Sequence, residues 1–333
     1  MALLEIRDLN VRFRNQPPGR SAISDLSLSL PKGSTTAVLG ESGSGKSLTA
    51  KAIMGLLPSS AEITSGSIVF DDREIVGAPE AVLRRLRGDA IGMVFQDALT
   101  ALNPTTTVGN QIAEVHRIHE RISRREARDR AVEALRAVRI PDAARRARDY
   151  PFQFSGGMRQ RAMLAMAIAR NPALLIADEP TTALDVTVQA QILELLQELS
   201  AERGMTVLLI THDVGVAAQI AQHAVVMYGG RVAEHGTIDE ILNHPSHPYT
   251  SGLLGSVPGP QFRGRDLPTI HGAPPNLAAL PSGCAFHTRC ELATEVCRSA
   301  IPSVARFGPS HSSWCHHAKE DIHEVHSRQA QEA

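Results

Sequence analysis

Gly40-Glu41-Ser42-Gly43-Ser44-Gly45-Lys46-Ser47 is a complete G-x-x-x-x-G-K-S sequence. An apolar run of buried-strand type, Thr36-Ala37-Val38-Leu39, precedes it, and residues 47–57, stopped by Pro58, are expected to form a helix after it. In such a unit, backbone N–H groups surround a phosphate, Lys46 reaches the β- and γ-phosphates, and the Ser47 hydroxyl ligates Mg²⁺. The alternative is a glycine-rich turn without a ligand, and the rest of the chain argues against it.

Composition sets the broad class of the protein. A chain of 333 residues usually forms two domains, or one large domain with an extension. Its 34 Lys plus Arg and 35 Asp plus Glu leave a net charge of −1, so nothing global indicates a nucleic-acid partner. The longest apolar candidate, residues 162–177, is interrupted by Arg170 to Pro172, and the N-terminus has no signal-peptide organisation. We therefore expect a cytoplasmic protein whose membrane role would need other subunits.

Two further segments show strand and helix patterns. Residues 1–39 are β-rich, and Phe13 ends one expected strand in a chain with only 4% aromatic residues. Phe13 is either a platform on which adenine stacks, worth about 1–3 kcal/mol, or an ordinary core residue. From Val108 to about Val138 the pattern is helical, and Ser123 begins a capping-box sequence. This segment predicts an inserted helical subdomain at about residues 97–165.

Candidate catalytic residues follow in order. Two glycines in Ser155-Gly156-Gly157 precede a helical run and form a second anion-binding helix start. Residues 174–177 are an apolar run that delivers Asp178, suited to Mg²⁺, and Glu179, suited to orienting and polarising water. The alternative, an exposed acidic strand end, does not explain the preceding apolar residues. A second strand, 206–210, delivers His212. A lone histidine is usually structural, but we favour a functional role here because this one also ends a core strand.

The order of these motifs resembles the motif set of ATP-binding cassette (ABC) ATPases over roughly residues 3–240. The resemblance implies an α/β fold: a P-loop NTPase core with an antiparallel β subdomain and the inserted helical subdomain. It also implies that two cassettes sandwich two ATP molecules, so that the signature Ser155-Gly156-Gly157 faces the nucleotide of the opposite protomer. Exporters, and soluble cassette proteins of DNA repair or translation, are competing classes, but the chain has no fused membrane domain, no second phosphate loop and no sustained heptads.

The resemblance assigns roles to individual residues. Glu179 is the expected catalytic carboxylate, His212 the switch histidine and Gln96 the metal- and water-sensing glutamine, while Ser47, Gln96 and Asp178 are the expected Mg²⁺ ligands. Phe13 becomes the expected adenine platform, and Asp185 belongs to a loop that contacts the second cassette. The expected nucleotide-binding set is Phe13, Gly40, Glu41, Ser42, Gly43, Ser44, Gly45, Lys46, Ser47, Leu48, Asp178, Ser155, Gly156, Gly157 and Asp185.

A narrower resemblance covers nearly the whole chain. The runs 94–97, 102–104, 154–161, 176–191, 247–250 and 274–277 look like ATP-binding subunits of oligopeptide and dipeptide permeases. It implies two transmembrane permease subunits, a second ATPase subunit that is either a paralogue or a copy of this chain, an extracytoplasmic solute-binding protein and a place on the cytoplasmic face of the membrane. The sequence leaves nickel complexes or other small solutes open as alternatives to peptides. Ala98 departs from the group, which commonly has proline there.

A C-terminal extension, about 241–333, holds half of the chain's 20 prolines and all four cysteines, and its tail after about 318 is expected to be disordered. The spacing of Cys284, Cys290, Cys297 and Cys315 is C-x5-C-x6-C-x17-C. Four thiols within 32 residues of a cytoplasmic protein suggest a cofactor. Zinc and free thiols are alternatives, but the permease ATPases that this region resembles bind a [4Fe-4S] cluster through a similarly spaced quartet.

Overall fold

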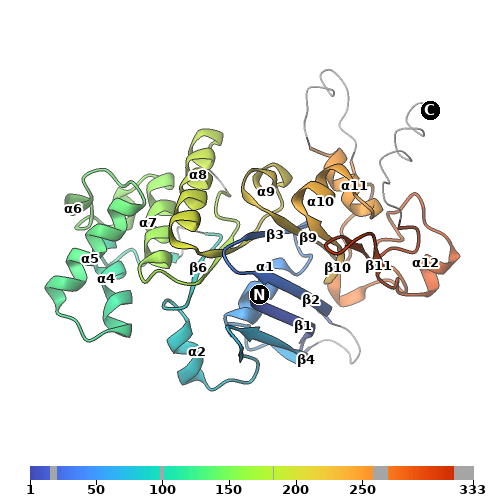
Figure 1. Ribbon diagram of the computed structural model, residues 1–333, viewed down its shortest axis with the longest axis horizontal. Coiled ribbons are helices and arrows are strands. Elements are labelled where there is room, and N and C mark those ends of the chain that lie inside the picture. Colours follow the sequence, from blue (N-terminus) through green and yellow to red (C-terminus); the bar gives the residue numbers. More distant parts are fainter. Residues whose placement is uncertain (16–20, 98–100, 183, 258–268, 319–333) are drawn as a thin grey trace. The chain divides into compact units, whose positions relative to one another are not determined.

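The computed structural model describes residues 1–15, 21–97, 101–182, 184–257 and 269–318 (Figure 1). The fold divides the chain into two compact units. The first unit holds Met1, Pro31–Ser34 and Gly77–Ile210, and the second holds Ala2–Leu30, Thr35–Val76 and the chain from Thr211 onward. Ala98 and the tail after residue 318 lie outside the described residues. The predicted division of the chain at residue 240 stays a prediction.

The first unit contains a parallel sheet in the order β8 (Thr206–Ile210), β7 (Leu174–Asp178) and β6 (Ile91–Val94). Leu174 pairs with Thr206 on one side and with Ile91 on the other. Every residue of β7 and β8 is buried, as expected for parallel strands that are covered on both faces. The strand ends that the sequence predicted at Asp178 and Ile210 are therefore confirmed, and both are fixed by core packing.

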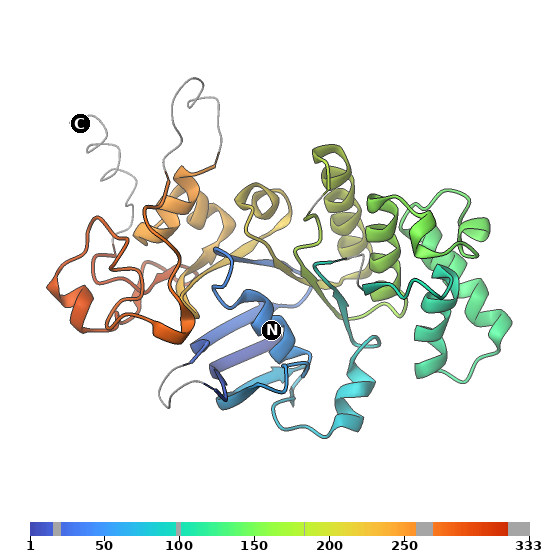
Figure 2. The ribbon, with the colours of Figure 1, turned by 180° about the vertical axis from the view of Figure 1, so that it is seen from behind.

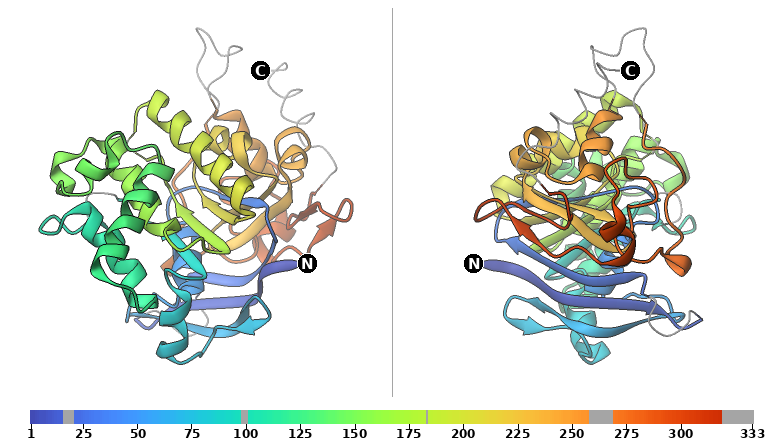
Figure 3. Two further views of the ribbon diagram at one scale, coloured as in Figure 1. Left: turned by 60° about the vertical axis from the view of Figure 1, so that its left-hand side comes forward. Right: turned by 90° about the vertical axis from the view of Figure 1, so that its right-hand side faces the viewer.

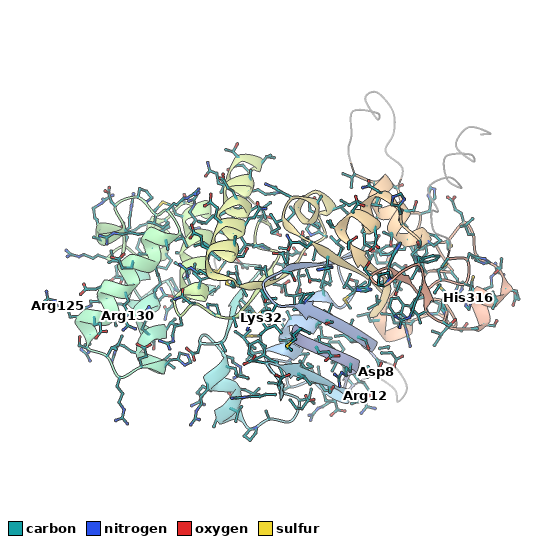
Figure 4. All side chains as sticks on the ribbon, in the orientation of Figure 1. Asp8, Arg12, Lys32, Arg125, Arg130 and His316 are labelled. Carbon is teal, nitrogen blue, oxygen red and sulfur yellow. The ribbon has the colours of Figure 1, made fainter. Side chains whose placement is uncertain are left out.

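Helices make up the rest of the first unit (Figure 3). They are α2 (Glu80–Leu86), α4 (Val108–His119), α5 (Arg124–Ala137), α6 (Ala143–Arg146), the 3₁₀ turn η1 (Pro151–Gln153), α7 (Gly156–Ile168) and α8 (Val186–Arg203). Ser123 caps α5 by accepting the N–H of Glu126 at 3.1 Å, as its capping sequence predicted. Helices α4, α5 and α7 pack on one another through buried residues such as Ile112 and Leu135. Figure 4 labels Arg125 and Arg130 on α5, and Arg130 pairs with Glu126.

The second unit begins with an antiparallel sheet in the order β2 (Ile23–Pro31), β1 (Ala2–Phe13), β4 (Ala61–Phe70) and β5 (Arg73–Glu74). Alternate residues of β2 are buried, which gives the expected polar and apolar faces. Phe13 at the end of β1 pairs with Ala61 of β4. Figure 4 labels Asp8 and Arg12 on β1, and Arg12 pairs with Glu62 at 2.6 Å.

A mixed sheet completes the second unit in the order β3 (Thr35–Leu39), β9 (His223–Tyr228), β10 (Arg231–Thr237), β12 (Ser312–Ser313) and β11 (Ala305–Arg306). Strands β3 and β9 are parallel, and the remaining pairs are antiparallel. The helical pieces of this unit are α1 (Lys46–Ile53), α9 (Val214–Ile220), α10 (Ile238–Asn243), α11 (Pro248–Gly255), η3 (Leu277–Ala279) and α12 (Glu295–Ser299). The C-terminal segment thus adds two short strands to a sheet that begins near the N-terminus.

Two sequence predictions about helices can be compared with these elements. The expected helix at 47–57 is wrong at its end, because α1 stops at Ile53 and Gly55 then adopts a left-handed conformation with φ of 61°. The proline-rich C-terminal extension has only short helices within its described part, as expected. In the described ranges, no helix is both long enough and apolar enough to cross a membrane.

Candidate functional site

The phosphate loop runs from the end of β3 into α1, both of the second unit. Its glycines Gly40, Gly43 and Gly45 have φ values of 145°, 81° and 105°, a region that side chains rarely enter. At Gly40 an added Cβ would lie 2.3 Å from the carbonyl oxygen of Met227, so no other residue fits there. These positions explain why the sequence has glycine at them, and they turn the chain back tightly ahead of the first turn of α1.

Lys46 and Ser44 give this loop the chemistry of an anion site. Lys46 is 5% exposed, and its Nζ donates to the carbonyl oxygens of Gly40 at 2.7 Å and Glu41 at 2.9 Å. Ser44 Oγ is buried and makes no hydrogen bond within the described part of the chain. An ammonium, an unpaired hydroxyl and the N-terminus of α1 all favour a phosphate. Ser47 and Leu48 follow in the first turn of α1, both half-buried.

Two other predicted nucleotide residues belong to the same unit. Phe13 ends β1 and is half-buried, so part of its ring is accessible to a ligand. His212 is exposed and precedes α9, whose N-cap Asp213 accepts the N–H of Gly215 at 2.8 Å. The cap fixes the backbone next to His212, because the side chain of Asp213 satisfies the start of the helix.

Glu179 and Gln96 of the first unit meet directly. Gln96 Nε2 donates to Glu179 Oε2 at 2.9 Å, and the Thr182 hydroxyl donates to the same oxygen at 2.9 Å. Glu179 is 9% exposed and has φ of 49°, a conformation rare for a residue with a side chain. Asp178, at the end of β7, is 4% exposed. The sequence singled out Gln96, Asp178 and Glu179 but missed Thr182, whose place three residues after Glu179 was the available signal.

The signature sequence caps a helix and leaves its first residues accessible. Ser155 is the N-cap of α7 and accepts the N–H of Met158 at 3.3 Å, while Ser155 and Gly156 are exposed. Gly157 is a packing requirement, because an added Cβ would lie 2.6 Å from Val188 Cγ1 on α8. Asp185, the exposed N-cap of α8, accepts the N–H of Val188 at 2.9 Å. Both helix starts of the first unit therefore present polar groups at the surface.

Burial raises the pKa of Cys284, Cys290 and Cys315, but the cysteines show no ligand geometry within the described part of the chain. Cys284 N–H donates to Cys297 O at 2.8 Å, and the thiols influence one another electrostatically. Burial raises the pKa of Cys290 to about 11 and that of Cys315 to about 12, and the neighbouring cysteines add to both shifts. Among the described residues, no group of three or more His, Cys, Asp or Glu side chains is arranged to hold a metal ion. The structure therefore does not support the expected cluster or zinc site as a preformed one.

One side chain of the phosphate loop is in contact with residues to which the sequence assigned no role. The carboxylate of Glu41 pairs with Arg289, and the backbone N–H of Glu41 donates to the hydroxyl of Tyr249 at 2.9 Å. Arg289 was missed because nothing in the sequence relates it to a loop 248 residues away.

Comparison with known proteins assigns the chain to two family models. Residues 23–182 match the ABC transporter model, and residues 233–297 match the C-terminal region of oligopeptide/dipeptide transporters. The oligopeptide transport ATP-binding protein OppD of Salmonella typhimurium is 48% identical over 320 residues, which cover 96% of this chain and 95% of that protein. The dipeptide transport ATP-binding protein DppD of Bacillus subtilis is 47% identical and covers 94% of each chain.

Solved structures show the same cassette fold. The ATP-binding cassette MJ0796, in a dimeric post-hydrolysis state bound to ADP and phosphate, has a TM-score of 0.63 at 29% identity. The match covers 71% of this chain and 98% of that chain. These findings confirm the predicted fold class.

Proposed function

This chain belongs to the ATP-binding subunits of ABC transporters, in the oligopeptide and dipeptide group, and on that premise we propose that it hydrolyses ATP to energise peptide import. The observation that carries the proposal is the phosphate loop, in which three glycines with positive φ surround a buried ammonium and an unpaired buried hydroxyl. ATP with Mg²⁺ is the substrate that such a loop fits. Lys46 would bind the β- and γ-phosphates, and Phe13 would stack on adenine.

Hydrolysis needs a metal site and a base, and the chain offers candidate residues for both. We assign Mg²⁺ to Ser47, Gln96 and Asp178, whose hydroxyl, amide and carboxylate oxygens suit this ion. Glu179 is the proposed base, because two donors fix one of its oxygens while its strained backbone holds the side chain in one direction. His212 is proposed to sense the γ-phosphate.

The proposed active form is a dimer of cassettes. Ser155, Gly156, Gly157 and Asp185 would bind the nucleotide held by the phosphate loop of the second cassette. The exposure of Ser155, Gly156 and Asp185 supports this proposal, because a second cassette can reach them. The dimeric state of the related cassette MJ0796 is consistent with this arrangement. ATP would close the dimer, and hydrolysis would reopen it.

The proposed partners follow from the same family. Two transmembrane permease subunits would carry the peptide, an extracytoplasmic solute-binding protein would deliver it, and this chain would sit on the cytoplasmic face of the membrane. Reconstitution in vesicles tests the proposal: short peptides with the binding protein should stimulate ATP hydrolysis. Stimulation by nickel complexes instead of peptides would change the substrate class, and a chain that never co-purifies with membrane subunits would belong with the soluble cassette proteins.

We also propose, as a separate point, that Cys284, Cys290, Cys297 and Cys315 bind a [4Fe-4S] cluster. The donor set fits the group in kind, since four thiols of one segment lie close enough to influence one another's pKa values. Because burial raises the pKa of Cys284, Cys290 and Cys315, binding must displace protons from these thiols. Protein purified without oxygen should be brown and contain iron and acid-labile sulfide, and Cys290→Ser should bleach it. A colourless preparation with one tightly bound zinc would favour the zinc alternative, and one without metal would favour free thiols.

A further inference from the structure

Arg289 of the C-terminal segment is buried against the phosphate loop, within the second unit. Its Nη1 donates to Glu41 Oε2 at 2.7 Å and its Nη2 to Glu41 Oε1 at 3.1 Å, which is a two-bond fork on one carboxylate. The Arg289 side chain is 4% exposed and that of Glu41 is 24% exposed. Water and salt screen such a buried pair less than a surface pair, and the two parallel hydrogen bonds fix the orientation of the Glu41 carboxylate.

The guanidinium is fixed from every side. Its Nε donates to His271 O at 2.8 Å, Nη2 also donates to Ile270 O at 3.2 Å, and Nη1 also donates to Tyr228 Oη at 3.3 Å. With the two bonds to Glu41, all five N–H groups of Arg289 have acceptors. Burial alone would lower the pKa of Arg289, but Glu41 and Tyr228 raise it, so the group stays charged.

A second contact fixes the backbone of the same loop residue. Tyr249 on α11 is fully buried and accepts the N–H of Glu41 at 2.9 Å. Its ring packs against Tyr228 and Phe286, with centroids 4.5 Å and 5.4 Å apart. Figure 2 shows the C-terminal segment, orange to red, beside α11. The aromatic group therefore anchors both Tyr249 and the segment that carries Arg289.

Glu41 connects these contacts to the phosphate-binding lysine, Lys46. The carbonyl of Glu41 holds the ammonium of Lys46 at 2.9 Å, so the position of Glu41 helps to set the position of Lys46. The carboxylate of Glu41 is a negative charge in a loop built for anions, and it would repel a triphosphate if it were unpaired. Arg289 cancels that charge and turns the carboxylate toward the C-terminal segment.

We propose that Arg289 is a positioning residue for the phosphate loop, which neutralises Glu41 and thereby sets the affinity for Mg-ATP. The inference rests on the proposed function, because it needs ATP as the ligand of this loop. It assigns to the C-terminal segment a role in nucleotide binding, exerted through Glu41. Catalytic chemistry is not part of this role, since Arg289 acts on the loop that binds the phosphates.

The test is a titration of the full chain with ATP and Mg²⁺, followed by kinetics in the assembled transporter. Arg289→Gln should raise the Kd and the KM for ATP about tenfold, the size of one unpaired charge beside a phosphate, and leave kcat within about twofold. The Kd of Arg289→Lys for ATP should lie between those of wild type and Arg289→Gln, since lysine keeps the positive charge but cannot form both hydrogen bonds to the carboxylate. The double variant Glu41→Gln/Arg289→Gln should bind ATP more tightly than Arg289→Gln, because it also removes the unpaired charge of Glu41. Arg298→Gln, at a side chain 61% exposed in the same segment, is the matched control and should change nothing.

The outcomes distinguish a failure of ATP binding by the phosphate loop from a failure of the positioning role of Arg289. If the wild-type chain binds no ATP, or Lys46→Ala binds it as well as wild type, the proposed function fails. If wild type binds and Arg289→Gln binds equally well, only the role of Arg289 fails. A fall in kcat without a change in KM, or a double variant no better than the single one, would also overturn it. Should Arg289→Gln not fold, Arg289→Lys against the double variant gives the same comparison.

Discussion

Glu179→Gln is the substitution that most directly tests the proposed hydrolysis. In the structure, Glu179 Oε2 accepts two hydrogen bonds of 2.9 Å, from Gln96 and Thr182. A glutamine side-chain oxygen can accept both bonds in the same place, so the fold should lose no more than about 1 kcal/mol of stability. What the substitution removes is the negative charge and the capacity to take a proton from water.

The expected loss of rate follows from that difference. A positioned general base contributes typically about 10²–10⁴-fold, which corresponds to roughly 2.7–5.5 kcal/mol of the activation barrier. The affinity for ATP should remain within about threefold of wild type, because the phosphate loop is untouched. Binding without hydrolysis should trap the closed dimer with ATP. Thr182→Val should lower kcat less, since Gln96 still donates to the carboxylate.

The assay is phosphate release in vesicles at saturating ATP and peptide, together with the nucleotide retained after gel filtration. Glu194→Gln on α8 is the matched control, because that carboxylate is 61% exposed and its pair with Arg139 is 3.7 Å long. We expect the control to hydrolyse ATP within about twofold of wild type. A Glu179→Gln transporter that releases phosphate near the wild-type rate would refute the assignment of the base, whatever its affinity for ATP.

Three further predictions concern the dimer, the packing and the pH response. If the second cassette is a copy of this chain, a mixture of Lys46→Ala chains and Ser155→Arg chains should recover ATPase activity from the one composite site left intact in each mixed dimer, and no recovery would contradict binding in trans. Gly157→Ala should lower the free energy of unfolding by about 1–3 kcal/mol, because its Cβ would lie 2.6 Å from Val188 Cγ1, and adding Val188→Ala should restore the melting temperature. Burial lowers the pKa of His247 to about 4 from 6.5, so the unfolded chain binds a proton that the folded chain does not. The free energy of unfolding should therefore fall as the pH drops from about 6.5 to about 4, by up to about 3 kcal/mol, with a flatter slope in His247→Asn. Equal slopes in urea titrations of the two proteins would show that His247 is not the cause.

The sequence was informative wherever a signal is local. Hydrophobic runs placed β7 and β8, and the side chains of Ser123 and Asp185 cap the helices that they precede. Where two helix-stop signals, Gly55 and Pro58, lie close together, the predicted end of the helix was wrong. Residues 47–57 looked helical to Pro58, but the left-handed Gly55 ends α1 earlier, and only the structure shows which signal prevails.

Other features depend on the folded chain and had no sequence signal. The left-handed backbone of Glu179 is stabilised by its surroundings, including the bond from its N–H to Ile210 O at 2.8 Å, so composition could not predict it. The four cysteines were visible as a pattern, yet no grouping of ligands is formed among the described residues. The spacing of the cysteines shows which thiols the segment contains, but it does not determine whether the folded chain brings them together around a metal.

The contact between Glu41 and Arg289 gives the C-terminal segment a physical connection to the phosphate loop that the motifs did not indicate. Arg289 directly precedes Cys290, and its guanidinium is held by carbonyls of residues 270 and 271 as well as by Glu41. Because all five of its donors are used, a shift of this part of the segment would have to break bonds to the phosphate loop or carry Glu41 with it. Glu41 in turn holds Lys46 through its carbonyl. The segment that carries Cys290 is therefore connected to Lys46 through Arg289 and Glu41 inside a single unit.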